Sequence, residues 1–106
     1  MSSATELIHR YFDLAPQPDV DAYFAQFAED AVVEDENQRH HGITAVRAWR
    51  TTVPLVTYTV HDVKEIDTGH DAHVDIAGDF PGSPVRLTFH FQFAADGRIT
   101  LLTIRP

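Results

Sequence analysis

One acidic residue lies where the chain could carry out proton chemistry. Residues 31–35, Ala-Val-Val-Glu-Asp, are predicted to form a strand, on which alternate side chains share a face. Asp35 therefore faces the same side as Val33, whereas Glu34 and Glu36 face the side that we expect to be solvated. An inward carboxylate without a partner is costly, and proton-transfer sites are where such a cost is retained. Asp35 is therefore a candidate catalytic group.

A structural role is the alternative for Asp35. The residue lies near the end of its predicted strand, where a carboxylate can accept hydrogen bonds from the backbone of the following turn. It can also pair with the nearby Arg39. The sequence leaves both roles open.

The composition limits the possible function classes. The 106 residues are predicted to form one domain, 1–106, because this is close to the most common domain size. The formal net charge of −8 disfavours binding to nucleic acid or to an anionic membrane surface. No apolar stretch approaches the roughly 20 residues that cross a bilayer, and the first residues lack the pattern of a signal peptide. The chain has no cysteine, which is typical of a reducing compartment, so we expect a cytoplasmic protein.

Three helices are predicted in the first half of the chain. The first begins at a capping box formed by Ser3 and Glu6 and ends before Pro16. The second begins at Asp19, and the third ends at Pro54. Each has apolar residues at helical spacing, which indicates one buried face per helix. These residues are Leu7, Ile8, Tyr11, Phe12 and Ala15 in the first helix, Val20, Tyr23, Phe24, Phe27 and Ala28 in the second, and Ile43, Val46, Trp49 and Val53 in the third.

From residue 55 onward the apolar residues recur with a period of two, which indicates strands. The alternating segments are 55–66, 72–80, 85–93 and 99–104. A change of phase near His61 and Asp62 predicts a bulge in the first of them. The polar run 37–42, before the third helix, is predicted to be a turn. Helices segregated from mainly antiparallel strands give an α+β fold.

This order of elements resembles the nuclear-transport-factor-2-like superfamily, whose fold is also called cystatin-like. The resemblance implies a cone in which three N-terminal helices pack on a strongly curved, mainly antiparallel sheet around a pocket. Residues 10–35 are also similar to the same region of the ketosteroid isomerases. The similar segments are Arg10-Tyr11, Asp19–Ala22 and Glu29–Asp35.

The resemblance implies roles for two residues and shows one departure. In ketosteroid isomerases the strand aspartate is the general base, and a tyrosine of the first helix donates a hydrogen bond to the developing enolate. These positions correspond to Asp35 and Tyr11. The same enzymes have a second, protonated aspartate in the oxyanion hole, and that position falls on Phe89 here. Loss of one such donor typically costs about a hundredfold or more in rate, so we do not expect true steroid isomerisation.

SnoaL-like polyketide cyclases share this fold and often use an inward acid. The resemblance therefore implies a small isomerase, cyclase or lyase that transfers a proton on an apolar carbonyl substrate. The superfamily also contains ligand-binding and dimerisation modules without catalytic activity. The fold alone does not choose between these two classes.

Aromatic residues on predicted inward faces are candidates for the pocket wall, and these are Trp49, Tyr58, Phe89 and Phe91. His61, beside the predicted bulge, is a candidate polar group of the pocket, with a surface position as the alternative. A metal site needs about three converging ligands. The adjacent His40 and His41 have diverging side chains, so we expect no metal and no other cofactor.

The expected partners are a small apolar ligand or substrate and a second copy of the chain. The residues between the apolar positions of segment 85–93 should form the outer face of the sheet. They are Arg86, Thr88, His90 and Gln92. A moderately polar face of this kind is suited to a twofold contact, so we expect a homodimer.

Overall fold

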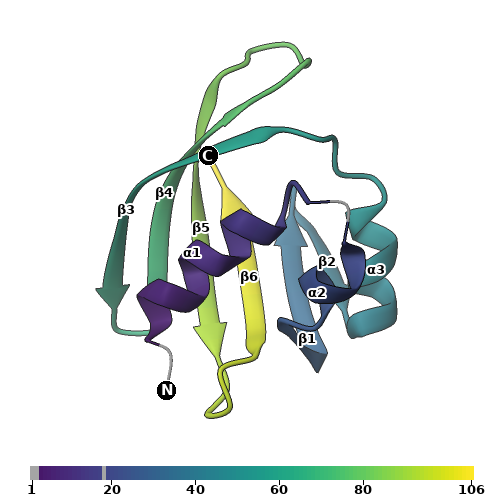
Figure 1. Ribbon diagram of the computed structural model, residues 1–106, viewed down its shortest axis with the longest axis vertical. Helices are drawn as coiled ribbons and strands as arrows, with labels where there is room; N and C mark the ends of the chain where they lie inside the picture. The colour runs from purple at the N-terminus through teal and green to yellow at the C-terminus, as the bar shows by residue number, and fades with distance from the viewer. Residues whose placement is uncertain (1–2, 18) are drawn as a thin grey trace.

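The computed structural model describes residues 3–17 and 19–106, in which helices pack against one curved, six-stranded sheet (Figure 1). The elements in chain order are α1 (Ala4–Leu14), α2 (Val20–Phe24), β1 (Phe27–Asp35), β2 (Gln38–His41), α3 (Ile43–Arg50), β3 (Thr57–Ile66), β4 (Gly69–Ala77), β5 (Val85–Phe93) and β6 (Ile99–Arg105). The predicted α+β class is confirmed. In the described residues two helices precede the sheet and α3 follows β2, so the helices are not all N-terminal to it.

The strands are arranged in the order β2-β1-β6-β5-β4-β3. Neighbouring strands are antiparallel except β1 and β6, which are parallel. In this register Asp35 lies opposite Ile104, one residue before the end of β6. The candidate acid is therefore placed beside the last strand of the chain.

The first two helices begin at the predicted caps. The Oγ of Ser3 accepts a hydrogen bond from the backbone N–H of Glu6 at 3.2 Å. The Oδ1 of Asp19 accepts from the N–H groups of Asp21 at 3.1 Å and Ala22 at 3.2 Å. Because these N–H groups have no partner within the helix, the side-chain caps fix where α1 and α2 begin.

The second helix is shorter than predicted. It ends at Phe24, and Phe27 is already the first residue of β1, where it pairs with Ile99 of β6. The backbone N–H of Ile99 also donates to the carbonyl of Gln26 at 2.8 Å. The prediction of a helical stripe through Ala28 was wrong because the helical spacing continues past the end of the helix, whereas pairing of Phe27 with β6 makes this segment a strand.

The polar run 37–42 contains a strand that the sequence did not predict. Glu36 and Asn37 have positive φ angles of 53° and 62° and form the two-residue turn between β1 and β2. Residues Gln38–His41 then pair with β1 as an edge strand. An exposed edge strand needs no apolar alternation, so its sequence looks like a loop.

The strands β5 and β6 follow the prediction closely, whereas β4 spans Gly69–Ala77 instead of 72–80. The register between β3 and β4 shifts between Val60 and Asp62, which confirms the predicted bulge. The strand β3 begins at Thr57 rather than at residue 55. None of the helices in residues 3–17 and 19–106 is both long and apolar enough to cross a bilayer.

The closed part of the core lies between α1 and the inner face of the sheet. The ring of Phe12 packs edge-on against Phe89, with 5.0 Å between the ring centroids. Tyr11 packs in the same way against Phe91, at 5.3 Å. Edge-to-face packing of this kind adds to the stabilisation from burial. In Figure 1, α1 crosses in front of the sheet while α3 lies near β1 and β2, which places the two helices at different parts of one face.

Candidate functional site

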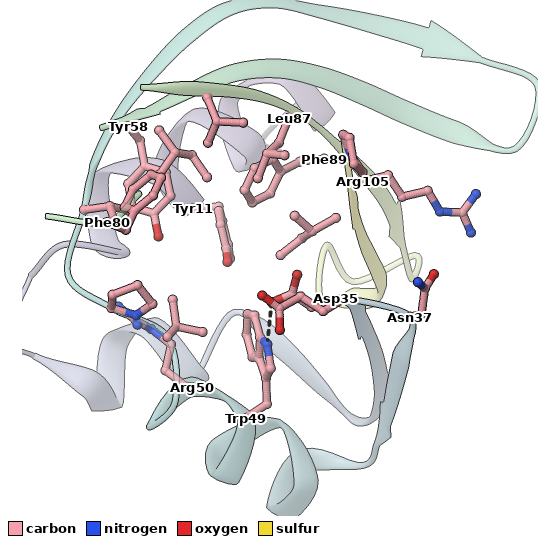
Figure 2. A pocket seen from close by; sticks show the side chains of 18 of the residues that line it. Tyr11, Asp35, Asn37, Trp49, Arg50, Tyr58, Phe80, Leu87, Phe89 and Arg105 are labelled. Carbon is pink, nitrogen blue, oxygen red and sulfur yellow. Dashed lines mark hydrogen bonds between the residues drawn. The ribbon is translucent and has the colours of Figure 1, made fainter. Parts of the chain in front are cut away.

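A cavity of about 500 Å³ opens beside this core (Figure 2). Its apolar wall includes Val53, Val56, Ile76, Val85, Leu87, Phe89 and Ile104. Its polar groups include Asp35, Tyr11, Tyr23, Tyr58, Trp49 and Arg50. A cavity of this size, with an apolar wall and few polar groups, is typical of a site for a small organic ligand.

Asp35 enters the cavity from the end of β1. Val33, on the same face of the strand, is completely buried, which confirms the inward direction that the alternation predicted. The carboxylate Oδ2 accepts a hydrogen bond from the indole Nε1–H of Trp49 at 3.1 Å. Trp49 is itself buried on α3, which packs against β1. The indole therefore fixes the position of the carboxylate.

The predicted alternative partner of Asp35 is engaged elsewhere. The guanidinium of Arg39 lies 3.3 Å from the carboxylate of Glu34, on the other face of β1. Within the part of the chain that the structure describes, no lysine, arginine or histidine nitrogen lies within 4.0 Å of the Asp35 carboxylate. Asp35 therefore has a neutral hydrogen-bond donor, Trp49, and no cationic partner within this distance among the described residues.

Two tyrosines form a buried pair in the wall of the cavity. The hydroxyl groups of Tyr11 and Tyr23 lie 2.8 Å apart, and each residue is 2% exposed. Burial raises the pKa of Tyr11 well above its usual value, and the neighbouring Tyr23 adds to the shift. Burial likewise raises the pKa of Tyr23. Both hydroxyls are therefore protonated at neutral pH, and the pair can offer one O–H to a ligand.

Tyr58 and Arg50 complete the polar part of the cavity. Burial raises the pKa of the Tyr58 hydroxyl, the charge of Arg50 opposes this shift, and the charge of Asp35 adds to it. The guanidinium of Arg50 lies over the ring of Tyr23, 5.0 Å from its centroid. It also donates from Nη2 to the carbonyl of Ala15, at the end of α1. The interior part of the wall thus combines the Asp35 carboxylate, three phenols and the Arg50 guanidinium, while the exposed Glu36 and Arg105 lie at the edge of the cavity.

The structure brings together most of the residues proposed from the sequence. Asp35, Tyr11, Trp49, Tyr58 and Phe89 all line the cavity, whereas His61 and Phe91 do not.

His61 lies on the outer face of the sheet, so its assignment to the pocket is corrected. Its Nε2 lies 2.8 Å from Asp75 and 2.9 Å from Arg86. Tyr58 and Val60 face the core, so strand alternation directs the next side chain, that of His61, outward. Phe91 faces inward but is fully buried beneath α1, further along β5 than the cavity extends.

The sequence did not identify Tyr23 and Arg50 as site residues. Tyr23 appeared only as part of the apolar stripe of a longer helix. Arg50 lies four positions after the buried Val46, so a cation occupies a position of the inward stripe of α3. This spacing is the signal that could have identified it.

Phe89 is the residue for which the resemblance to the ketosteroid isomerases implied a departure. Its ring packs against Phe12 and lines the cavity. An apolar ring there cannot donate a hydrogen bond.

In the described residues, no group of three or more histidine, aspartate or glutamate side chains is placed to hold a metal ion.

Comparisons with known proteins agree with this architecture. The sequence profile of the SnoaL-like domain matches residues 8–102. A comparison with curated proteins gave no match. A candidate polyketide cyclase from Sinorhizobium meliloti has 34% sequence identity and a TM-score of 0.83, covering 98% of this chain and 100% of that one.

Two further solved structures share the fold at lower identity. One is the RV0760c protein of Mycobacterium tuberculosis in complex with estradiol-17beta-hemisuccinate, with 18% identity, a TM-score of 0.81, and coverage of 98% of this chain and 93% of that one. The other is an NTF2-like protein of unknown function from Cytophaga hutchinsonii, with 14% identity, a TM-score of 0.80, and coverage of 98% and 89%. The fold and the profile match over most of the chain lead to one conclusion: this protein belongs to the SnoaL-like domain family.

Proposed function

We propose that this SnoaL-like domain is a small isomerase, cyclase or lyase that transfers a proton on an apolar carbonyl compound, with Asp35 as the base. The observation that supports this function best is the carboxylate of Asp35 in the wall of an apolar cavity, hydrogen-bonded to the neutral indole of Trp49. A carboxylate held in this way can accept a proton from a bound ligand.

The proposed proton transfer starts at the carbon next to a ligand carbonyl. The indole of Trp49 engages Oδ2 of Asp35, so Oδ1 would take the proton from that carbon. The electron pair of the broken C–H bond then forms the enolate double bond, and negative charge develops on the carbonyl oxygen. A hydroxyl of the Tyr11–Tyr23 pair would donate a hydrogen bond to this oxygen. Return of the proton to another carbon gives an isomerisation, and attack of the enolate carbon on a second carbonyl gives a cyclisation.

The proposed ligand class follows from the cavity and from the relatives. The volume of about 500 Å³ fits a small organic molecule, and most of the wall is apolar. A Mycobacterium tuberculosis protein of the same fold holds a steroid ester, and the Sinorhizobium meliloti relative is a candidate polyketide cyclase. Both point to apolar compounds that carry carbonyl groups. Phe89 in place of an acidic donor argues against steroid isomerisation itself.

Exchange of carbon-bound protons tests the proposal without knowledge of the natural substrate. Apolar ketones such as tetralone, and β-diketones, are incubated with the protein in D₂O. NMR follows the loss of the signal from the protons on the carbon next to the carbonyl group. Asp35→Asn keeps the shape and the acceptor for Trp49 but cannot take a proton, so we expect the rate to fall by about a hundredfold or more.

Glu36→Gln is the matched control, because it removes one carboxylate from the adjacent, exposed position at the edge of the same cavity. We expect it to exchange nearly as fast as the wild type. Equal rates in Asp35→Asn and the wild type would refute the assignment of Asp35. Binding of these ketones by the wild type without any exchange would indicate a non-catalytic ligand-binding module instead.

We also propose that the domain forms a homodimer through the outer face of its sheet and works in the cytoplasm. The outer face carries Thr88, His90 and Gln92, which are partly exposed. The absence of cysteine supports a reducing compartment.

A further inference from the structure

Arg50 is a cation in the cavity wall without an acidic partner. Its side chain is half-buried and lines the cavity. In residues 3–17 and 19–106, no aspartate or glutamate oxygen lies within 4.0 Å of its guanidinium. Partial burial of a charge without a counter-ion is unfavourable. Such a charge is therefore a candidate for pairing with a ligand.

The other arginine that lines the cavity differs in both respects. Arg105 lies 3.7 Å from the carboxylate of Glu34 and is largely exposed. Figure 2 shows its side chain directed away from the centre of the cavity, whereas Arg50 lies close to Trp49 on the side opposite Asp35. The cavity is therefore polarised, with a cation on one side of the indole and a carboxylate on the other.

The charge of Arg50 acts on the polar groups around it. It lowers the pKa of Tyr11, Tyr23 and Tyr58, against the larger effect of burial. A lowered tyrosine pKa means that the anionic form is stabilised. The same field stabilises a negative group of a ligand at this place.

We propose that Arg50 forms a subsite for an anionic group, such as a carboxylate, on an otherwise apolar ligand. The guanidinium is suited to this because its planar N–H groups match the two oxygens of a carboxylate. Repulsion by Asp35 at the other end directs the anionic group toward Arg50 and the reacting carbonyl toward Asp35. The proposal deepens the proposed function in that it uses the same cavity, but it concerns binding and not turnover.

A purely structural role is the competing explanation for Arg50. Its Nη2 donates to the carbonyl of Ala15, and its guanidinium stacks on Tyr23, so it links α3 to the end of α1 and to α2. These contacts leave further N–H donors of the guanidinium that have no hydrogen-bond partner among the described residues. The two explanations predict different results when ligand charge is varied.

A pair of fluorescent probes that differ in one charged group makes the test. Anilinonaphthalene sulfonate is an apolar anion, and N-phenylnaphthylamine is its neutral counterpart. We expect the wild type to bind the anion more tightly, although the protein carries a net charge of −8, and we expect the two probes to compete. Arg50→Gln should weaken binding of the anion by about tenfold or more and change binding of the neutral probe by less than about twofold.

Arg47→Gln is the matched control. Arg47 is on the same helix, also lies over an aromatic ring, that of Phe24 at 4.5 Å, and does not line the cavity. The Arg47→Gln substitution removes the same charge outside the cavity, so we expect the affinity for either probe to change by less than about twofold. If Arg47→Gln and Arg50→Gln lose the same affinity for the anionic probe, the effect is one of general charge, and the proposal is overturned.

Three other outcomes would also overturn it. The first is that Arg50→Gln loses the same affinity for both probes. The second is that the wild type binds the neutral probe as tightly as the anionic one. The third is that the two probes do not compete. The wild-type measurements need no variant, so they decide the matter if Arg50→Gln does not fold. Proton exchange on ketones is measured separately. A wild type that exchanges protons but does not prefer the anionic probe refutes the subsite alone. A wild type that prefers the anionic probe but does not exchange protons refutes the proposed catalysis alone.

Discussion

At the scale of single residues, the Tyr11–Tyr23 pair decides how the cavity can stabilise negative charge. One hydroxyl must donate to the other across 2.8 Å, so only the second hydroxyl of the pair has its proton available for a ligand. In Figure 2 the hydroxyl of Tyr11 is directed toward the middle of the cavity. This direction makes Tyr11 the proposed donor and Tyr23 the group that holds it in place.

Removing each hydroxyl in turn separates these roles. We expect Tyr11→Phe to lower the rate of proton exchange on a bound ketone by about a hundredfold or more, because the proposed donor is lost. Tyr23→Phe keeps that donor and loses only its hydrogen-bonded support, so we expect a decrease of about tenfold or less. Exchange rates measured by NMR at saturating ketone give both values.

The unfolding free energy is the control for this pair. Each substitution leaves one buried hydroxyl without its partner, so both variants should lose about 1 kcal/mol in urea denaturation. Similar stability with unequal rates would support a direct role for Tyr11. Equal losses in rate would contradict the assignment of the donor.

Sequence reasoning reached Asp35, Tyr11 and the aromatic wall residues Trp49, Tyr58 and Phe89, but not Tyr23 or Arg50. The inward direction of Asp35 follows from strand alternation, which is a local property of the backbone. The positions of Tyr23 and Arg50 depend on how α1, α2 and α3 pack together. Helical spacing places Arg50 on the inward stripe of α3, but no local periodicity shows that it meets Tyr23 and the end of α1 in one cavity.

At the scale of elements, the hairpin between β3 and β4 includes a glycine that the fold requires. Gly69 has a φ angle of +154°, and a Cβ atom there would lie 2.3 Å from the backbone carbonyl oxygen of Phe91. A contact of this length with backbone cannot be relieved by a side-chain rotation. The close approach of β4 and β5 at this end of the sheet is therefore possible because Gly69 has no side chain.

Gly82 provides a matched comparison for this position. It also has a positive φ angle, +86°, but a Cβ atom there would have no atom within 4 Å. We expect Gly82→Ala to cost about 1–2 kcal/mol from backbone strain alone. Gly69→Ala should cost more, about 3 kcal/mol or above, because strain and collision add. Urea midpoints of the two variants measure the difference, and equal midpoints would show that β4 and β5 separate without cost.

The element predictions failed where pairing between distant segments overrides local pattern. Phe27 fits the helical stripe and also a strand, and its partner Ile99 lies far along the chain. The strand β2 was missed for a related reason, since an edge strand exposes its side chains and shows no alternation. By contrast, β5 alternates apolar and polar residues along its length, and its limits were predicted correctly.

At the scale of the whole molecule, the outer face of the sheet carries a network of charged groups. His73 lies 2.6 Å from Asp62, and His90 lies 2.7 Å from Asp71. The guanidinium of Arg86, with His61, lowers the pKa of Asp75 to about 2. The carboxylates of this face are therefore engaged by neighbouring side chains, and a second copy of the chain would meet paired groups and not isolated ones.

The prediction for this face is a homodimer at micromolar concentration. Leu101 lies on the outer face in a shallow hollow that it shares with the polar residues Thr88, His90 and Thr103, so this face combines apolar and polar side chains. This arrangement is typical of a protein interface, and a twofold axis would bring the two copies of Leu101 close together. We expect light scattering to give a mass of about twice 11.9 kDa.

Leucine-to-arginine substitutions test whether this face makes the contact. Leu101→Arg places like charges across the proposed axis, so we expect it to shift the mass to that of the monomer. Leu55→Arg is the control, because Leu55 is 79% exposed in the segment before β3 and lies on none of the strands. It should leave the mass unchanged. A wild-type mass near 11.9 kDa throughout the micromolar range would refute the homodimer, and a dimer in which Leu101→Arg has no effect would place the contact on another face.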